Sequence, residues 1–351
     1  MPASPFAPSS SKPGHGEVCL TLLPPAIPTF STLTYAYPLQ LLPSTPHILA
    51  PIDPPSSSVL ASTNVATATR TASPTPLRPS LVPLLFLLSY GGGLLPPDVL
   101  SLKITLAPST RLVVTTQGST KIFPPPPSLP HSTASQYLHA HVSAHAALWL
   151  APDPTQPFRG SRYSQKQVFE VDAHGGSVGI VDWVCEGRRA RGESWRDVRG
   201  WRGGNEVWRM NKDKDGRKLV VRDNVILEGE DIGGRMEGIG VFGTVLLMGT
   251  LFESLGGFFL EEFKALPRIG GRDWGDVKAG EMSNREKKRK ERWKVEKEDG
   301  VLWTAASIRG CELIKFGARE VEGGRNWLRW MLNEEGSIGR EFGNGGLMFV
   351  R

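Results

Sequence analysis

Three histidines, His139, His141 and His145, lie close together and are the first candidates for metal chemistry. If the segment around them is a strand, all three share one face by its period of two; if it is a helix, His141 and His145 do. Imidazole binds nickel and zinc, so the cluster could serve metal transfer or a metal-dependent hydrolase. No carboxylate or cysteine is close in the sequence to complete a site. We therefore expect solvent-facing histidines, whose joint replacement by alanine leaves nickel affinity unchanged.

One motif indicates a serine nucleophile, but its surroundings oppose that role. Gly175–Gly179 reads Gly-Gly-Ser-Val-Gly, which matches the Gly-x-Ser-x-Gly pattern of serine hydrolases. That pattern requires a helix after the serine, whereas a strand pattern follows here. The last histidine of the chain is His174, so no histidine downstream can act as the base. A serine in a β-turn is the expected role.

A glycine triplet, Gly91, Gly92 and Gly93, could in principle cradle a phosphate. No Gly-Lys-Ser or Gly-Lys-Thr sequence follows it, and Pro96 and Pro97 oppose a regular helix start. We therefore expect a tight turn between strands, where glycine supplies backbone conformations that other residues avoid.

Arginine and glutamate residues crowd residues 186–196, directly after an apolar strand, and two further arginines lie at positions 159 and 162. The group comprises Arg159, Arg162, Arg188, Arg189, Arg191 and Glu193. Charge of this density directly after an apolar strand is incompatible with a core and is expected at the rim of a β layer. The group lacks a catalytic partner, which leaves two roles open. It could form a polar protein interface or a water-filled channel wall, or it could form salt bridges that orient the β layers.

A second charged stretch, Arg285–Arg292, reads Arg-Glu-Lys-Lys-Arg-Lys-Glu-Arg and could bind nucleic acid. Binding of that kind would weaken steeply with salt. Glutamates lie within and around the stretch, so we expect a solvated, partly helical surface insert and no nucleic-acid binding.

The composition limits what these residues can do. The chain has 351 residues, of which 39% are hydrophobic, and its 39 glycines and 29 prolines favour short strands over long helices. The formal net charge is +6, with most charges in the C-terminal half. Three widely spaced cysteines favour a reducing compartment over a disulfide framework. No secretory signal and no apolar run of membrane-spanning length is present, so a soluble, cytoplasmic protein is expected.

Hydrophobic alternation predicts the elements that must position the candidate residues. Strands are expected at Glu17–Leu23, Ser31–Tyr37, Leu81–Tyr90, Leu100–Leu106, Arg111–Thr116, Tyr163–Val171, Val178–Val184, Asn205–Met210, Lys218–Leu227 and Ile239–Met248. The fourth and fifth of these are expected to pair with each other across a turn. Helices are expected at Phe252–Phe263 and Gly317–Asn333. The predicted fold class is mainly β, with a few helices toward the C-terminus.

The same features predict a single domain. Residues 1–13 are rich in Pro, Ser and Ala and should form a flexible tail, and residues 14–351 form the domain. Two inserts are expected in it. One, at about 43–80, is an almost uncharged Pro, Ser, Thr and Ala tract, and the other, at about 270–299, is hydrophilic.

Four segments, in order, resemble the urease accessory protein D family, called UreD or UreH, in its eukaryotic, fungal-like form. Pro152–Tyr163 reads PDPTQPFRGSRY and Asp182–Trp195 reads DWVCEGRRARGESW. Ser89–Asp98, SYGGGLLPPD, resembles the YGGG-x-x-x-GD turn of that family, with Pro97 in place of a glycine. Leu112–Phe123, LVVTTQGSTKIF, resembles its TTQ-x-x-TK strand. The residues that match these motifs are Gly91, Gly92, Gly93, Gln117, Lys121, Asp153, Arg159, Gly160, Arg162, Tyr163, Asp182, Gly187, Arg188, Arg191, Gly192 and Glu193.

The resemblance implies a function as well as a layered or β-helix-like scaffold. It implies a urease maturation chaperone without catalytic activity that binds urease apoprotein and, through a UreF-like accessory protein, a UreG-like GTPase that brings nickel. It also implies that the metal passes through the interior as a transient guest and that no cofactor is permanently bound. Asp98, Asp153, Asp182 and Glu193 could line that path as oxygen ligands. The histidine-based hydrolase and the nucleic-acid-binding protein remain the alternatives.

Overall fold

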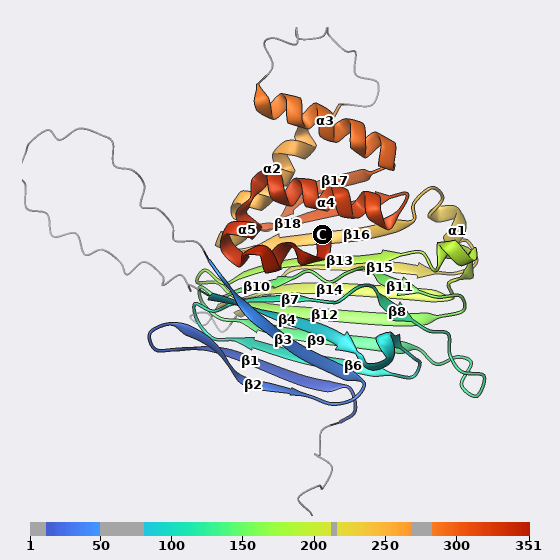
Figure 1. The fold of residues 1–351 in the computed structure, drawn as a ribbon, viewed down its shortest axis with the longest axis horizontal. Coiled ribbons are helices and arrows are strands. Elements are labelled where there is room, and N and C mark those ends of the chain that lie inside the picture. Colours follow the sequence, from blue (N-terminus) through green and yellow to red (C-terminus); the bar gives the residue numbers. More distant parts are fainter. Residues whose placement is uncertain (1–11, 50–80, 212–215, 268–282) are drawn as a thin grey trace, which may run out of the picture.

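Two stacked β-sheets with a layer of helices on one of them make up the computed structural model, which describes residues 12–49, 81–211, 216–267 and 283–351 (Figure 1). The helices lie on the outer face of the larger sheet. The outer face of the smaller sheet carries exposed side chains such as His139 and Lys166. The predicted class, mainly β in a layered stack with helices toward the C-terminus, is confirmed.

The smaller sheet has seven strands. Their order in space is β15 (Gly216–Glu228), β14 (Gly200–Asn211), β12 (Arg162–Asp172), β9 (Ala134–Val142), β6 (Val99–Leu106), β1 (His15–Leu23) and β2 (Ile27–Tyr35).

The larger sheet has eleven strands. Its main path is β17 (Leu302–Ile308), β18 (Cys311–Ala318), β16 (Val241–Met248), β13 (Ser177–Cys185), β10 (Ala147–Leu150), β7 (Arg111–Thr115), β4 (Leu81–Ser89) and β3 (Leu39–Ile48). Three short strands lie beside this path, namely β5 (Gly93–Leu94), β8 (Thr120–Ile122) and β11 (Thr155–Pro157).

Successive strands alternate between the sheets, so the middle of the chain winds like a β-helix. β6, β9, β12 and β14 are parallel neighbours in the smaller sheet. β4, β7, β10 and β13 are parallel neighbours in the larger one. The connections from the smaller to the larger sheet are short turns. Those in the opposite direction are long loops, which carry β5, β8 and β11.

Antiparallel hairpins lie at the lateral edges of both sheets. In the smaller sheet, β1 pairs with β2 at one edge and β14 pairs with β15 at the other. In the larger sheet, β3 pairs with β4 and β17 pairs with β18. The parallel winding is therefore enclosed between antiparallel pairs.

The predicted pairing of residues 100–106 with residues 111–116 is wrong. β6 pairs with β1 and β9 in the smaller sheet, whereas β7 pairs with β4 and β10 in the larger one. The turn between β6 and β7, with Ser109 at a φ of 63°, carries the chain from one sheet to the other. Local alternation cannot separate a hairpin from such a crossover, because each joins two half-buried strands through a turn.

The proposed insert at about 43–80 begins too early. Residues 43–48 belong to β3, an edge strand that contains Pro43 and Pro46. Proline has no amide hydrogen to donate and is tolerated on such an edge, which is why composition concealed the strand. Residues 50–80 and 1–11 lie outside the described residues, as do residues 270–282 of the second proposed insert.

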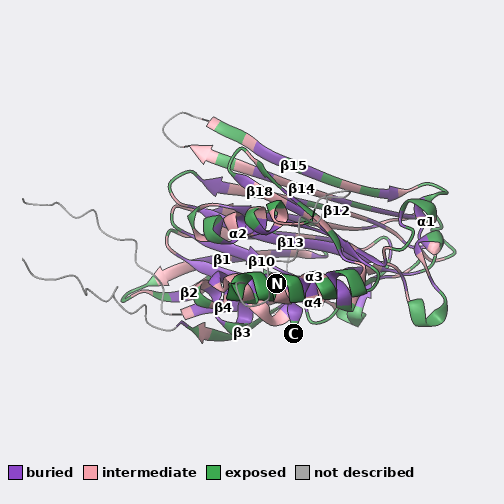
Figure 2. Cartoon of the chain, turned by 90° about the horizontal axis from the view of Figure 1, so that it is seen from above, coloured by how far each residue is buried: buried purple, intermediate pink, exposed green. Residues whose placement is uncertain are grey.

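β13 is buried along its whole length, as predicted for residues 178–184 (Figure 2). One face of it packs against the smaller sheet and the other against the helices, so it belongs to both hydrophobic cores. Gly179 lies beneath two aromatic rings. A Cβ atom there would be 2.5 Å from Trp149 Cε3 and 2.6 Å from Phe252 Cε1. Only glycine leaves room for these rings.

The helical layer closes the outer core. It consists of α2 (Glu253–Lys264), α3 (Asn284–Asp299), α4 (Val321–Glu335), α5 (Ser337–Phe342) and the 3₁₀ segments η5 (Thr250–Phe252) and η6 (Asn344–Val350). The remaining short helices, η1 (Tyr90–Gly92), η2 (Arg189–Arg191), η3 (Trp195–Asp197) and α1 (Ile232–Arg235), lie in loops. None of the helices in the described ranges is both long and apolar enough to cross a membrane.

The two predicted helices are found, but the second begins later than expected. Residues 252–263 correspond closely to α2. The C-terminal helix starts at Val321, because Gly317 and Ala318 are the last residues of β18. The β17–β18 hairpin was not predicted.

One face of α3 is bound to the layer below it by ion pairs, contrary to the expected solvated insert. Glu262 of α2 lies 2.9 Å from Arg292 Nη1, 2.7 Å from Arg289 Nη2 and 3.0 Å from Arg285 Nη2. Arg292 is 1% exposed and Glu262 is 2% exposed. Because Arg292 and Glu262 are both buried, removing the charge of either one would leave the other without a partner.

The three arginines also set the protonation of Glu262. Burial alone would raise the pKa of this carboxyl. The hydrogen bond from Arg289 and the positive charges of Arg292 and Arg289 outweigh burial and lower the pKa to about 2. The carboxylate therefore stays ionised in the folded protein far below its ordinary range.

Replacing Glu262 by Gln should destabilise the fold by about 3–5 kcal/mol at neutral pH, because buried guanidinium groups lose their counter-charge. A pKa lowered by folding contributes stability above the ordinary value of 4.5, which is lost as the pH falls toward 2. The difference in unfolding free energy between wild type and Glu262→Gln, measured by urea titration, should therefore shrink below pH 4.5. Glu261→Gln is the control, since Glu261 is 64% exposed. An equal loss in the control, or a difference that does not change with pH, would contradict this account.

Candidate functional site

The long loops that leave the larger sheet gather at one end of the sandwich (Figure 1). They follow β4, β7, β10 and β13. Backbone pairing ties them together, because β5 pairs with β8, β8 with β11 and β11 with β13. The four segments quoted above for their family resemblance reach into these loops. The winding thus brings Gly93 and Val184, which are far apart in the sequence, to one place.

The glycine triplet forms the predicted turn. Gly91 and Gly92 have φ of 78° and 73°, which favours glycine. Gly93 opens β5, where a Cβ atom would lie 2.5 Å from the carbonyl oxygen of Lys121. Positive φ at Gly91 and Gly92 and close backbone packing at Gly93 account for the glycines of this turn.

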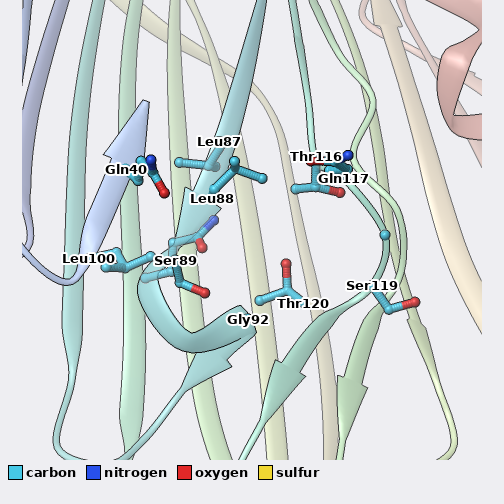
Figure 3. Close-up of a pocket in the computed structure, with 12 residues that line it drawn as sticks. Gln40, Leu87, Leu88, Ser89, Gly92, Leu100, Thr116, Gln117, Ser119 and Thr120 are labelled. Atoms are coloured by element: carbon cyan, nitrogen blue, oxygen red, sulfur yellow. The ribbon is translucent and has the colours of Figure 1, made fainter. Parts of the chain in front are cut away.

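Beside this turn lies a cavity of about 220 Å³ at the end of the space between the sheets (Figure 3). Its lining includes the polar residues Gln40, Ser89, Thr116, Gln117, Ser119, Thr120 and Gln136. Leu87, Leu88 and Leu100 form the apolar part of the wall.

Asp153 and Asp98 stabilise loops. Asp153 Oδ2 accepts a hydrogen bond of 3.0 Å from the amide of Gly118, and its Oδ1 lies 3.0 Å from Arg325 Nη2 on α4. Asp98 Oδ2 accepts a 2.9 Å hydrogen bond from the amide of Leu95. These two carboxylates lie in separate loops, each with its own partners.

Glu193 and Arg188 form the centre of the loop at residues 186–199. Glu193 is 4% exposed and accepts hydrogen bonds of 3.0 Å from the amide and from Nε of Arg188. The hydrogen bonds from Arg188 lower the pKa of Glu193. Gly187 must lack a side chain, because a Cβ atom would lie 2.8 Å from Glu193 Oε2, and Gly192 has φ of 72°. The expectation that this charged group avoids the interior is wrong for Glu193.

The other arginines of the group face outward. Arg159 Nε lies 2.9 Å from Asp197 Oδ1, and the Arg159 side chain is 62% exposed. Arg189 Nη1 lies 3.1 Å from Glu320 Oε1. Arg191 is exposed and Arg162 is half-buried. Gly160 has φ of 78° and donates its amide hydrogen to the carbonyl oxygen of Asp197. Salt bridges thus order part of this surface, and exposed guanidinium groups remain on it.

The three histidines do not form one cluster. His139 and His141 lie on the outer face of β9, whereas His145 is in the following turn with φ of 56°. The carboxylate missing from the local sequence comes from the next strand. Glu170 Oε2 lies 3.3 Å from His139 Nε2 and 3.9 Å from His141 Nδ1. Within the described residues, no group of three or more His, Cys, Asp or Glu side chains is arranged to hold a metal ion.

The serine of the Gly-x-Ser-x-Gly match is structural. Ser177 is fully buried at the start of β13, so a strand follows it, as expected. Its hydroxyl accepts a hydrogen bond of 3.3 Å from the amide of Leu251.

A row of polar side chains crosses the apolar interior between the sheets. We call it the inter-sheet polar row, and it consists of Gln136, Tyr163, Gln165, Asp182, Asn205, Asp223, Thr244 and Lys315. Gln136 lines the cavity of Figure 3 and is the cross-strand partner of Gln165. The row therefore starts at the loop end of the sandwich.

Asp182 lies at the centre of the row. Gln165 Nε2 donates to its Oδ1 at 2.9 Å and Asn205 Nδ2 donates to its Oδ2 at 2.7 Å. Burial raises the pKa of Asp182, and the hydrogen bonds from Asn205 and Gln165 offset this only in part. Asn205 is 2% exposed, and its Oδ1 has no hydrogen-bond partner among the described residues.

The far end of the row holds a second carboxylate. Thr244 Oγ1 donates to Asp223 Oδ2 at 3.0 Å, and Lys315 Nζ lies 2.6 Å from Asp223 Oδ1. Sequence analysis named Tyr163 and Asp182 but missed the other members of the row as site residues, namely Gln136, Gln165, Asn205, Asp223, Thr244 and Lys315. The available signal was that Gln165 occupies an inward position in the same alternation as Phe169.

Oxygen and amide groups inside an apolar sandwich can receive a cation. Asp182 and Asp223 supply carboxyl oxygens, and Asn205 supplies an unpaired amide oxygen. No histidine belongs to the row, which makes the set weaker for a transition metal than an imidazole site.

Comparison with known proteins assigns the chain to a family. The family model described as UreD urease accessory protein matches residues 53–341. Urease accessory protein 4 of Cryptococcus neoformans var. grubii is 28% identical over 92% of this chain and 90% of its own length. The relative from Anaeromyxobacter sp., named urease accessory protein UreD, is 32% identical over 70% of each chain. A Schizosaccharomyces pombe protein named urease accessory protein ureD-like is 28% identical over 73% of this chain and 82% of its own length.

These relatives are named as accessory proteins and not as enzymes. That agrees with the expectation that the chain is not itself an enzyme. The family match covers well over half of the residues and includes the loops gathered at one end of the sandwich. The chain belongs to the UreD family of urease accessory proteins.

Proposed function

We propose that this protein is a urease maturation chaperone that binds urease apoprotein and helps to deliver nickel to the urease active site. The observation that carries the proposal is the inter-sheet polar row, which begins at a polar cavity and places Asp182 and Asp223 inside an otherwise apolar core. Burying a carboxylate costs free energy that pairing and hydrogen bonds must offset, so two of them inside an apolar core indicate a role beyond packing. Nickel is the cargo in this proposal, and no permanently bound cofactor is involved.

The side chains of the row suit the passage of a nickel ion better than its permanent binding. Carboxylate, amide and hydroxyl oxygens are weaker ligands for nickel than imidazole or thiolate, so an ion bound to them can leave again. Asp182 is held by Gln165 and Asn205, whose amide groups can rotate to offer oxygen in place of NH₂. Loading and unloading would then need only side-chain rotation.

Partner binding belongs to the loop end in this proposal. Arg159, Arg189 and Arg191 are exposed there, on the same end of the sandwich as the cavity. Their charges fit a polar interface with urease apoprotein or with a UreF-like accessory protein, through which a UreG-like GTPase would join the complex. The cytoplasm is the compartment that this role requires.

The two alternative functions have less support. A histidine-based hydrolase needs His139, His141 and His145 together, and His145 lies in a turn apart from the other two. A nucleic-acid arm needs free cations, whereas Arg289 and Arg292 pair with Glu262.

Asp182→Asn should lower the activation of urease apoprotein by nickel about 10- to 100-fold, the range typical when a group that supports a metal ion is removed. The substitution removes the charge but keeps the shape, so the variant should still bind urease apoprotein in a pull-down. Urease activity after incubation with apoprotein, accessory proteins and nickel is the measurement.

His139→Ala, His141→Ala and His145→Ala combined form the matched control, since they remove metal-binding side chains outside the row. The control should retain activation and nickel affinity. Full activation by Asp182→Asn, or a loss confined to the histidine variant, would refute the proposed role of the row.

Arg191→Glu should weaken binding to urease apoprotein or to the UreF-like protein about tenfold, which corresponds to 1.4 kcal/mol. The cause would be repulsion between the new carboxylate and an acidic partner surface, and raising the salt concentration should reduce the effect. Lys290→Glu, on the exposed face of α3, is the control at a distant surface. Equal loss in both variants, or none in either, would rule out the loop end as the docking surface. Titration calorimetry at two salt concentrations measures both.

A further inference from the structure

The lateral end of the inter-sheet polar row is occupied by the ammonium group of Lys315. Its Nζ lies 2.6 Å from Asp223 Oδ1 and 3.3 Å from Thr244 Oγ1. It also lies 5.6 Å from the centre of the Phe242 ring. The lysine side chain is 29% exposed and that of Asp223 is 8% exposed. The ammonium thus reaches in from the solvent side and ends at a buried carboxylate.

Asp182 at the middle of the row is held in a different way. Its two oxygens accept hydrogen bonds from the neutral amides of Gln165 and Asn205, and the charge of Lys315 acts on it only through space. Of these two carboxylates, Asp223 is the one for which the described residues supply a direct ion pair with Lys315.

The two positions are adjacent in the fold. Asp182 and Thr244 are cross-strand partners on β13 and β16, and Thr244 and Lys315 are cross-strand partners on β16 and β18. Asn205 and Asp223 are cross-strand partners on β14 and β15. An ion at Asp182 would consequently have Asp223 and Thr244 as its next available oxygens along the row.

We propose that Lys315 is a tethered cation that occupies the oxygens of Asp223 and Thr244 and so denies them to a divalent ion. The consequence is directional, because a divalent ion that enters at the cavity end can reach Asp182 but cannot leave by the lateral edge. This inference rests on the proposed function for its biological meaning, but it makes a separate statement about ion binding. The ammonium already holds the oxygens of Asp223 and Thr244, and its positive charge repels a second cation at this place.

Lys315→Met tests the proposal, since methionine keeps an unbranched apolar side chain and removes the charge. The isolated full-length protein is titrated with NiCl₂ alone by calorimetry. The variant should bind one more nickel ion per chain than wild type does. The double variant Lys315→Met/Asp223→Asn should lose the additional ion.

Lys103→Met is the matched control. Lys103 forms a 2.9 Å ion pair with Glu17 on the exposed outer face of the smaller sheet. This substitution also frees a carboxylate from a lysine, but a solvated one, so the nickel stoichiometry should equal that of wild type. A gain in the control equal to that in Lys315→Met would overturn the proposal.

Thermal unfolding followed by circular dichroism verifies that each variant is folded. Lys315→Gln serves as a second neutral variant that can still donate a hydrogen bond to Asp223, and it should gain the ion even if Lys315→Met does not fold. Wild-type stoichiometry in a folded neutral variant would show that Lys315 is only a structural partner of Asp223. Because urease is absent from these titrations, their failure is distinguishable from failure of the proposed function, which Asp182→Asn tests.

Discussion

The structure depends on the parallel winding that buries β13 on both of its faces. A strand in this position can expose nothing to water, so its outward side chains pack under helices and its inward ones meet the smaller sheet. On the outward side, aromatic rings bury the strand, and Gly179 leaves room for the rings of Trp149 and Phe252. On the inward side the same strand carries Asp182, whose charge must be accommodated by groups from the opposite sheet. The two-layer core and the polar row are thus consequences of one arrangement.

The same winding explains why the long loops of the candidate site lie at one end of the molecule. Each pass from the larger sheet to the smaller one makes a long loop at that end, and the short strands β5, β8 and β11 tie successive loops together. Loops built on a rigid scaffold can differ in sequence without disturbing the core. Glu193 and Arg188 show how such a loop is fixed internally, while neighbouring arginines stay exposed. Scaffold and recognition surface are therefore separate parts of one chain.

Local sequence patterns predicted where most strands lie, but they did not predict which strands pair with each other. The alternation from Tyr163 to Phe169 and the apolar run of β13 were sufficient to identify strands, because burial repeats with the period of the backbone. The crossover after β6 was mistaken for a hairpin, since pairing between distant strands leaves no local trace. For the site, Asp182 was named from a motif, whereas Asp223 and Lys315 belong to the row only through contacts across the sandwich. The pairing of Arg292 with Glu262 was likewise invisible in a charge run that looked solvated.

The antiparallel hairpins at the sheet edges have a consequence for assembly. A parallel β-helix left open at its sides would offer free backbone groups to another copy of itself and could extend indefinitely, as unprotected sheet edges do. Here the direction of the chain reverses at the outermost strands, β2 and β15 of one sheet and β3 and β17 of the other. The edge strand β3 also contains two prolines. The parallel windings therefore end in antiparallel pairs on both sides, and the prolines of β3 hinder another strand from pairing with that edge.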